Sequence, residues 1–508
     1  MNHLFDGLLE GRDGAQRFAE IPGESARHYS YADVLAVSAR FANVLVAHGV
    51  KPGDRVAAQV PKSIEAVMLY LAVVRAGAVF LPLNTAYTAS EVEYFLTDAT
   101  PAIFIGDPLK EDVLGQVAQR AGAAMMTMGV WTKPEVNAGS FLEEGLSAET
   151  EFRSVPRAGD DLAAILYTSG TTGRSKGAML SHGNLLSNAK TLADYWRFTP
   201  EDVLIHALPI FHTHGLFVAI NITLVAGGSL IFLPHFDAEE ILSNMPNASA
   251  LMGVPTFYTR LLDHEGLTKD ASAHMRLFVS GSAPLLADTH DAWRERTGHA
   301  ILERYGMTET SMNTSNPYDG ERRAGTVGYP LPGVDVRVTD EAGTALGAGE
   351  IGAIEVRGPN VFSGYWQMPE KTAEEMRADG FFITGDVGVF SDDGYLSIVG
   401  RSKDLVISGG YNVYPKEVEL LIDALPGVQE SAVIGVPHPD FGEGVVAVVV
   451  PSGVDLIEEG AVIGALSDCL ARYKQPKRVF VVDELPRNAM GKVQKAALRE
   501  RFGTVFGG

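Results

Sequence analysis

The sequence predicts an α/β protein. We expect a large N-terminal domain with parallel-sheet subdomains and a small β-rich subdomain, followed by a small mobile α+β lid. Three observations support this prediction. Strand-like apolar runs alternate with helix-like segments, the pattern of parallel strands joined by crossover helices. At 508 residues the chain is too long for one core. Between residues 327 and 399 short strands and Gly- and Pro-rich turns replace the alternation.

The large domain contains two runs of alternating elements. In the first, strands are expected at 56–60, 78–83 and 102–106, with helices at 63–76 and 90–98. In the second, strands are expected at 162–166, 203–208, 229–233, 250–254 and 275–280, with helices at 238–245 and 256–262. The most apolar stretch, 216–233, is interrupted by Asn221 and Gly227. It therefore predicts a buried helix followed by a buried strand, not a membrane span.

The C-terminal part changes character twice. Short strands at 334–339, 352–357 and 395–399 predict the β-rich subdomain. After Arg401 we expect helices at 416–425 and 461–473 and strands at 430–436, 445–450 and 479–482. That is a compact domain of about a hundred residues. We place the domains at 1–401 and 402–508, because glycines flank residues 402–404 and would permit a hinge.

Composition excludes several classes of function. Lys and Arg number 41 against 63 Asp and Glu, a net charge of −22, which argues against broad binding to nucleic acid or anionic membranes. Anionic substrates must therefore be met by local cations. The single Cys469 excludes an internal disulfide and fits a reducing cytoplasm; we expect it to be a buried, inert thiol. No signal peptide is apparent at the N-terminus.

The segment from Tyr167 to Gly177 is the most informative part of the chain. It follows an apolar strand-like run, and its glycines permit the positive φ angles of an anion-binding turn. It is not a Walker A loop, because Ser175 precedes Lys176 and Gly177 follows it. Hydroxyls and cations suited to a polyphosphate come from Thr168, Ser169, Thr171, Thr172, Arg174 and Lys176, with turns at Gly170, Gly173 and Gly177.

This segment resembles the phosphate-binding motif of the adenylate-forming enzymes. That superfamily comprises acyl-CoA synthetases, luciferases and the adenylation domains of peptide synthetases. Four more segments match it in the expected order, and the resemblance covers nearly the whole chain. They are 305–309 (YGMTE), 384–386 (TGD), 400–404 (GRSKD) and 486–492 (PRNAMGK).

The resemblance implies that the large domain binds ATP and Mg²⁺. A carboxylate near phosphates needs a hard cation between them, and the family's magnesium carboxylate matches Glu309. Thr168 would join Glu309 at the metal, Thr308 would contact the α-phosphate, and Asp386 would grip the ribose hydroxyls. The remaining nucleotide contacts would come from the stacking Tyr305, the adenine wall Gly281, Ser282 and Ala283, the adjoining Gly306 and Met307, and Arg401.

The resemblance also assigns roles to the lid. Lys492 would be the adenylation lysine, a compact charge able to reach both the acid and the α-phosphate. Lys403 would be the hinge residue. The CoA channel would be lined by Ser408, Gly409, Gly410 and Tyr411. In the family the matching lysine can be acetylated, so an acetyltransferase and a deacetylase acting on Lys492 are possible partners.

The acid is predicted from three further segments, 209–215, 253–260 and 307–318. They resemble the malonate–CoA ligases within this superfamily, which would connect the chain to fatty acid metabolism. Malonate carries a second carboxylate that a pocket cation must neutralise, and His212 and Arg260 are the candidates. Ser280 and Met307 complete the expected acid site, and His212, Thr308, Glu309 and Lys492 the expected catalytic set.

Other functions remain open from the sequence alone. The nearest is a CoA ligase for another short acid, such as methylmalonate or a monocarboxylate. An adenylation module that loads a carrier protein is a second, and a non-catalytic nucleotide-binding protein a third. No nucleic acid partner is expected, and the protein is expected to be a monomer or a weak dimer.

Overall fold

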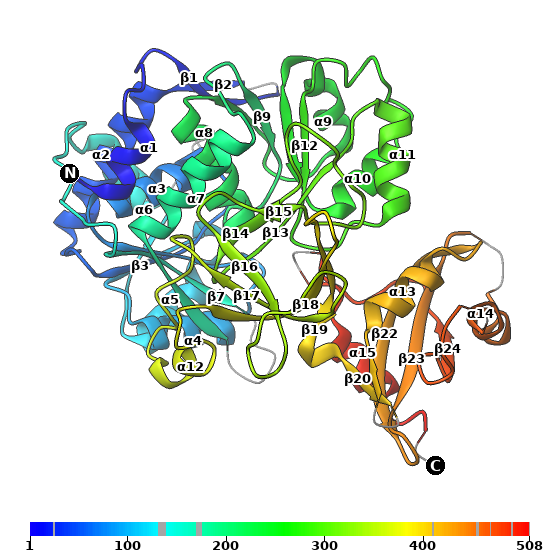
Figure 1. The fold of residues 1–508 in the computed structure, drawn as a ribbon. Helices are drawn as coiled ribbons and strands as arrows, with labels where there is room; N and C mark the ends of the chain where they lie inside the picture. Colours follow the sequence, from blue (N-terminus) through cyan, green and yellow to red (C-terminus); the bar gives the residue numbers. More distant parts are fainter. Residues whose placement is uncertain are drawn as a thin grey trace. The chain divides into compact units, whose positions relative to one another are not determined.

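The computed structural model describes residues 1–506 except 24–25, 131–138, 169–174, 409–410, 454–456, 468 and 489–490. The chain forms two compact units (Figure 1). Unit 1 comprises Met1–Asp335 and Val356–Phe382, and unit 2 comprises Val336–Glu355 and Ile383–Gly508. The predicted fold class is confirmed. The boundary between residues 401 and 402 and the hinge at Lys403 stay predictions.

Unit 1 contains a large sheet with nine strands among the described residues. Six central strands are parallel, and antiparallel strands close both edges. The strand order is β15 (Tyr329–Pro330), β14 (Ser311–Ser315), β13 (Leu302–Met307), β12 (Leu277–Ser280), β11 (Ala250–Gly253), β9 (Val203–His206), β10 (Ser229–Phe232), β1 (Arg17–Ile21) and β2 (Arg27–Ser30).

A second sheet of unit 1 is parallel except for its last pair. In the described residues its order is β6 (Ala124–Thr127), β5 (Ile103–Gly106), β3 (Arg55–Gln59), β4 (Val79–Pro82), β7 (Leu162–Thr168) and β8 (Lys176–Ser181). The strands are near-continuous apolar runs because helices cover both faces of such a sheet. Val79, Leu81, Phe104 and Ile165 form one core with Phe95 of a neighbouring helix.

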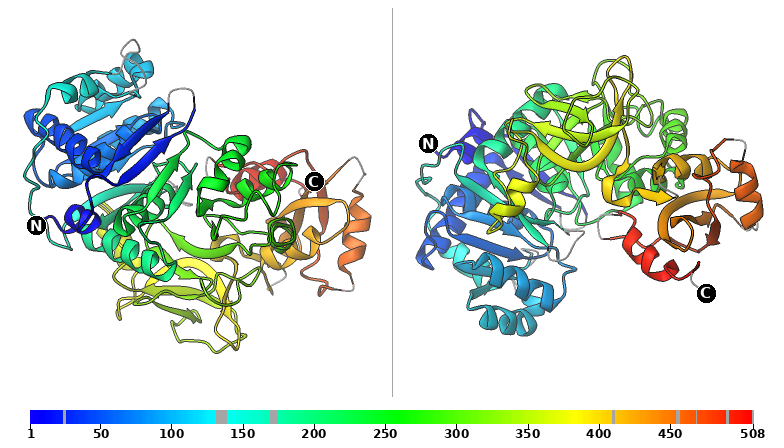
Figure 2. Two further views of the ribbon diagram at one scale, coloured as in Figure 1. Left: turned by 90° about the horizontal axis from the view of Figure 1, so that it is seen from above. Right: turned by 60° about the horizontal axis from the view of Figure 1, so that its bottom comes forward.

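The helices of unit 1 lie against these sheets (Figure 2). They are α1 (His3–Leu9), α2 (Tyr31–Ala47), α3 (Ile64–Arg75), α4 (Ala89–Ala99), α5 (Glu111–Ala121), α6 (Ser140–Ser147), α7 (His182–Tyr195), α8 (Asn221–Ala226), α9 (Ala238–Asn244), α10 (Pro255–Leu262), α11 (Ala287–Thr297) and α12 (Pro369–Glu374). Helix α3 begins after the capping Ser63 and is buried all round, which explains its apolar residues on every face.

The apolar stretch at 216–233 folds as predicted. A π-helical segment, His214–Ile220, continues into α8, and β10 follows it, all buried. None of the helices built by the described residues is long and apolar enough to cross a membrane.

Unit 2 is built mainly from two sheets. The first contains β16 (Asp335–Thr339), β17 (Gly352–Arg357), β18 (Phe382–Phe390) and β19 (Leu396–Arg401). The second has the order β21 (Tyr411–Val413), β20 (Val406–Ser408), β23 (Gly442–Pro451) and β22 (Val428–His438), with β24 (Arg478–Val481) also paired to β23. The helices are α13 (Pro415–Asp423), α14 (Glu459–Leu466) and α15 (Lys495–Phe502). Val418 and Ile422 of α13 pack on the β22–β23 hairpin.

One expectation about unit 2 is wrong. Helix α14 ends at Leu466, short of the predicted end at residue 473. Cys469 therefore follows the helix instead of lying on its apolar face, and its side chain is exposed, not buried. Its inertness can no longer be argued from burial.

Candidate active site

Strands β7 and β8 bring the two ends of the predicted phosphate loop together. Thr168 at the end of β7 pairs with Lys176 at the start of β8, and the Thr168 hydroxyl donates to the Lys176 carbonyl at 3.4 Å. The predicted loop residues Ser169, Gly170, Thr171, Thr172, Gly173 and Arg174 lie outside the described residues. The structure thus places both flanks of the loop.

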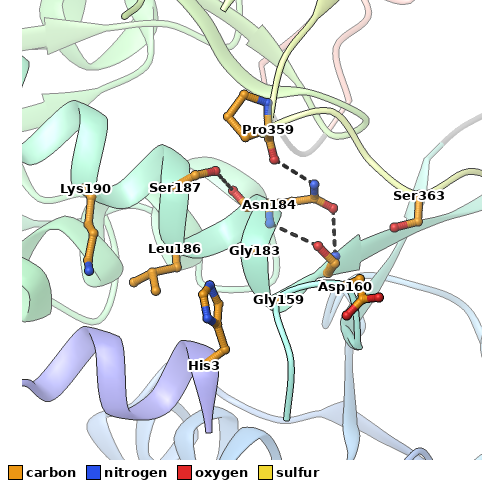
Figure 3. Close-up of a pocket in the computed structure, with 11 residues that line it drawn as sticks. His3, Gly159, Asp160, Gly183, Asn184, Leu186, Ser187, Lys190, Pro359 and Ser363 are labelled. Carbon is orange, nitrogen blue, oxygen red and sulfur yellow. Dashed lines mark hydrogen bonds between the residues drawn. The ribbon is translucent and has the colours of Figure 1, made fainter. Parts of the chain in front are cut away.

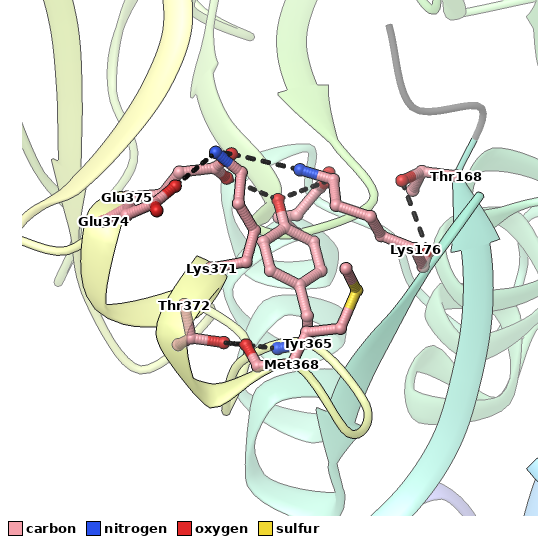
Figure 4. A network of polar contacts seen from close by, with 9 residues as sticks. Thr168, Lys176, Tyr365, Met368, Lys371, Thr372, Glu374 and Glu375 are labelled. Atoms are coloured by element: carbon pink, nitrogen blue, oxygen red, sulfur yellow. Dashed lines mark hydrogen bonds and ion pairs between the residues drawn. The ribbon is translucent and has the colours of Figure 1, made fainter. Parts of the chain in front are cut away.

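Glu309 and Lys176, predicted for magnesium and phosphate, meet in one polar network. Figure 4 labels its members Lys176, Tyr365 and Glu375. The Tyr365 hydroxyl lies 3.1 Å from Glu309 Oε1 and 2.7 Å from Glu375 Oε2. Lys176 Nζ lies 3.0 Å from Glu375 Oε1 and 4.0 Å from the centre of the Tyr365 ring. Burial, then the charge of Glu309, raises the pKa of Tyr365, so its hydroxyl keeps its proton.

His212 and Thr308 line one small cavity. Its other walls come from the ends of β4 and β7 and from the segment before the π-helix, with Pro82, Asn84, Tyr87, Leu166, Tyr167 and Phe211. A residue predicted to meet the acid and one predicted to meet the α-phosphate therefore face the same space. This is the arrangement that attack of a carboxylate on a phosphate requires.

The expected adenine wall follows β12. Ser280 ends that strand with no exposed surface, and Ser282 has a left-handed φ of +71°. The Ser282 hydroxyl lies 3.3 Å from Nδ1 of His214. Burial, and then the Arg304 charge, hold the pKa of His214 well below its ordinary value, so this imidazole is neutral.

The motif strand β13 carries the expected adenine-stacking residue and its neighbours. Tyr305 is buried, and Gly306 packs so closely on β14 that a Cβ would lie 1.9 Å from the Ser311 carbonyl oxygen. Only glycine fits there. Met307 ends the strand, and Thr308 and Glu309 follow in a turn.

Arg304 is the functional candidate that sequence reasoning missed. It is 4% exposed, and its Nε and Nη2 have no hydrogen-bond partner among the described residues. Burial lowers the pKa of Arg304 to about 9. Its guanidinium lies so close to Gly281 that a Cβ there would be 2.3 Å from Cζ. The hydroxyl of Ser280, next to Gly281, is also buried and has no hydrogen-bond partner in the part of the chain that the structure describes.

Arg260 does not join this group. It lies at the end of α10 with an exposed side chain, its guanidinium carbon 5.7 Å from the centre of the Phe236 ring. It is not among the residues that line the His212 cavity. Its predicted contact with the acid has no support in this geometry.

The remaining predicted residues belong to unit 2. Asp386 is 4% exposed and forms an ion pair with Arg401, Oδ1 to Nε, at 2.9 Å. Burial, then the charge of Arg401, lowers the pKa of Lys403. Ser408 is buried, and the exposed Tyr411 stacks on Tyr473 with ring centres 4.7 Å apart. Gly409 and Gly410 lie outside the described residues.

Lys492 is exposed on a tightly bonded turn. The Asn488 side chain accepts the Lys492 N–H at 3.0 Å, and the Asn488 N–H donates to the Lys492 carbonyl at 2.9 Å. Arg487 donates to the Gly491 carbonyl at 2.5 Å and also pairs with Glu430 on β22. These bonds hold the backbone of Lys492, and the residue is exposed.

A wider cavity of unit 1 is separate from these residues (Figure 3). His3, Gly159, Asn184, Lys190 and Pro359 are among the residues that line it, and none of the predicted site residues is. Its polar groups largely bond to one another: Asn184 donates to the Pro359 carbonyl at 2.8 Å, and the Gly183 N–H to the Gly159 carbonyl at 2.6 Å. We place the candidate active site at the His212 cavity and the Glu309 network.

Comparison with known proteins identifies the family. The AMP-binding enzyme family matches residues 13–366, and its C-terminal domain matches residues 417–492. The ATP-bound crystal structure of MatB from Rhodopseudomonas palustris is 60% identical over 99% of both chains, with a TM-score of 0.96. A feruloyl-CoA synthase from an Amycolatopsis species is 37% identical over 93% of this chain and 94% of its own. A malonate–CoA ligase from Arabidopsis thaliana is 35% identical over 88% of this chain and 81% of its own. This chain belongs to the AMP-binding enzyme family.

Proposed function

We propose that this protein ligates malonate to coenzyme A with ATP. One malonate carboxylate attacks the α-phosphorus, pyrophosphate leaves, and a malonyl-adenylate forms. The CoA thiol then loses its proton and attacks the acyl carbon, and AMP leaves. The likeness to ATP-bound MatB supports ATP as the activating substrate. The likeness to a malonate–CoA ligase supports the acid and the thiol.

Arg304 is the observation that carries the choice of a dicarboxylate. Arg75 is 6% exposed, and its Nε also has no partner among the described residues, but its two terminal nitrogens donate to the Leu35 and Phe152 carbonyls at 2.9 and 2.8 Å. Among the described residues, Arg304 has no such acceptors at Nε and Nη2. A buried cation without acceptors is costly unless a ligand supplies negative charge. The distal carboxylate of malonate supplies it, and the Ser280 hydroxyl adds a donor.

An aromatic monocarboxylate fits this site less well, although a feruloyl-CoA synthase is among the relatives. The carboxylate of such an acid is consumed by adenylation, and only the ring and its substituents remain in the pocket. They carry no full charge to neutralise Arg304. The buried guanidinium therefore favours an acid with a second carboxylate.

Magnesium fits the residues around Glu309. The residue is 5% exposed, its Oε1 accepts from a neutral tyrosine hydroxyl, and carboxylate oxygens are ligands that a hard cation prefers. Glu309 and Thr168 would hold the ion. When bound, it supplies positive charge that neutralises the phosphate oxygens.

The other roles follow the family pattern and remain part of the proposal. Thr308 orients the α-phosphate in the cavity where His212 meets the acid. Asp386 and Arg401 grip the ribose, and Lys492 brings its ammonium to the reacting oxygens. The CoA channel, the acetylation of Lys492, a place in fatty acid metabolism and a cytoplasmic location are further elements of this proposal.

The test is pyrophosphate release with Mg-ATP and CoA across a panel of acids. The panel holds malonate, methylmalonate, succinate, acetate, propionate, ferulate and a medium-chain fatty acid. A clear preference for malonate supports the proposal. A preference for a monocarboxylate would leave the adenylation chemistry standing but refute the role of Arg304. Activity only with a carrier protein in place of CoA would make the chain a loading module.

A further inference from the structure

The segment that contains Tyr365 joins the two halves of the nucleotide site through its backbone. The Phe362 N–H donates to the Glu309 carbonyl at 2.8 Å. The Trp366 N–H donates at 2.7 Å to the carbonyl of Gly177, the residue that follows Lys176 in the chain. Tyr365 itself forms an isolated bridge with Ala178. Residues 362–366 are thus bonded at one end to the predicted magnesium residue and at the other to the strand that begins with the phosphate-loop lysine.

The Tyr365 side chain repeats this connection. Its hydroxyl has one proton and lies within hydrogen-bond distance of two carboxylates, those of Glu309 and Glu375. Two carboxylates on one hydroxyl repel each other unless cations neutralise them. Lys176 and Lys371 supply that charge on the Glu375 side, at 3.0 and 3.2 Å. In the proposed function, magnesium bound by Glu309 would add further positive charge to this network.

Lys176 is held on three sides. Its ammonium pairs with Glu375, lies over the Tyr365 ring, and follows a backbone that β7 fixes. Its side chain is 17% exposed, so solvent screens the ion pair only in part. The ammonium of Lys176 is therefore already held in position before a phosphate binds.

The helix that presents Glu375 is also tied to Tyr365. The Thr372 hydroxyl accepts the Tyr365 N–H at 2.9 Å and donates to the Met368 carbonyl at 3.0 Å. Helix α12 therefore begins from the same turn that places the tyrosine, and Glu375 follows its last residue. The two side chains therefore share one support, the turn that Thr372 bonds to Tyr365 and Met368 (Figure 4).

We propose that Tyr365 and Glu375 are positioning residues for ATP activation. Tyr365 sets the Glu309 carboxylate that receives magnesium, and Glu375 sets the Lys176 ammonium that meets the phosphates. This inference rests on the proposed function for the roles of Glu309 and Lys176, but not on the identity of the acid. Neither residue touches the reacting atoms; each acts through its partner.

The two variants that test it are Tyr365→Phe and Glu375→Gln. Tyr365→Phe keeps the ring under Lys176 and removes only the hydroxyl. It is expected to raise the magnesium concentration for half-maximal rate about tenfold, because Glu309 loses a hydrogen bond that orients it. Glu375→Gln keeps the shape and removes the counter-ion. It is expected to lower kcat about tenfold without raising the KM for ATP, because Lys176 stays cationic but is no longer fixed.

Glu374→Gln is the matched control. Glu374 precedes Glu375 in the chain and has a side chain that is 66% exposed, and among the described residues its ion-pair partner is Lys371, at 2.9 Å. The same change of charge at this position is expected to leave kcat, KM and magnesium dependence within twofold of the parent. A thermal melt of each variant shows whether it folds.

A double-mutant cycle separates positioning from a general structural role. If Glu375 acts through Lys176, Glu375→Gln adds little to Lys176→Met, and the effects are not additive. Additive losses, a Glu375→Gln variant no different from Glu374→Gln, or an unchanged magnesium dependence in Tyr365→Phe would each overturn the inference. All assays use whichever acid the panel shows to be fastest, so a wrong choice of malonate does not affect the result.

Discussion

Replacing Arg304 with methionine is expected to stabilise the protein while destroying its use of malonate. Burial lowers the pKa of Arg304 to about 9, which corresponds to about 5 kcal/mol of unfavourable desolvation. Below pH 9 the side chain is charged in both the folded and the unfolded state, so the full penalty is present at pH 7. It lessens only as the pH rises above about 9, where the folded state loses the proton first.

Methionine removes the charge and fills much of the same space, so part of the desolvation cost of the buried guanidinium is removed. We expect the free energy of unfolding without ligands to rise by about 1–3 kcal/mol, with roughly 2–4 °C in Tm for each kcal/mol. At the same time kcat/KM for malonate should fall about 10²–10³-fold, because the distal carboxylate loses its buried partner. Malonate should raise the Tm of the parent but not of Arg304→Met.

Arg276 provides the matched control. It is also partly buried, but it donates two hydrogen bonds at 2.7 Å to Asp202, whose side chain is 5% exposed. Arg276→Met leaves that carboxylate unpaired and should destabilise the protein by about 1–3 kcal/mol, with kcat/KM for malonate unchanged at a temperature where the variant is folded. Thermal melts of both variants measure the change in stability, and the pyrophosphate assay measures their use of malonate. An Arg304→Met variant that is less stable than the parent, or that still prefers malonate, would refute the reasoning.

Three further predictions concern unit 2. Burial raises the pKa of Asp423 to about 6, so the free energy of unfolding falls as the pH rises from 4 to 6, because the unfolded state loses this proton before the folded state does. Asp423→Asn should therefore stabilise the protein by about 1–3 kcal/mol at pH 7.5 and by little at pH 4. Denaturant titration at both pH values measures the difference. Arg487→Ala removes the donor to the Gly491 carbonyl and should slow adenylation about tenfold, while single-turnover thioester formation from preformed acyl-adenylate keeps its rate. Stoichiometric acetylation of Lys492 should abolish adenylation because the ammonium loses its charge; an undiminished rate would exclude that role.

The fold was predictable wherever local pattern and burial agree. Each strand expected in the parallel sheets occurs within a few residues of its predicted place, because a strand buried on both faces must be apolar throughout. Strand β14 was not predicted, since Ser311, Asn313 and Thr314 are polar. They are buried all the same, and two of them bond to distant groups: the Thr314 hydroxyl donates to the Val327 carbonyl at 2.7 Å, and the Asn313 side-chain oxygen accepts from Asn360 at 3.1 Å. No local pattern carries that information.

The site was predictable in its motifs and not in its acid pocket. Thr308 and His212 come from segments about a hundred residues apart, and the fold places both at one cavity. Arg304 directly precedes the recognised motif at 305–309, but its burial depends on Gly281 of another segment, and so the lack of partners for its donors among the described residues could not be read from spacing. Arg260 was chosen by its segment alone, and its position at the end of α10 leaves it exposed.

Three buried or partly buried cations differ in the partners that the protein gives them, and so in the ligands that they can bind. Lys62 is partly buried, and its ammonium donates to the His206 and Leu233 carbonyls at 3.0 and 2.6 Å, so it needs no ligand. Lys176 already has Glu375 as its counter-ion, and a triphosphate must share the lysine with that carboxylate. Arg304 alone of these three has donors without acceptors among the described residues. In a chain of net charge −22, a buried cation left in this state is unfavourable in the free protein and favourable only with an anion bound. Binding of the acid should therefore raise the free energy of unfolding of unit 1 by more than the small size of the acid suggests. A dicarboxylate should raise it more than a monocarboxylate of equal length.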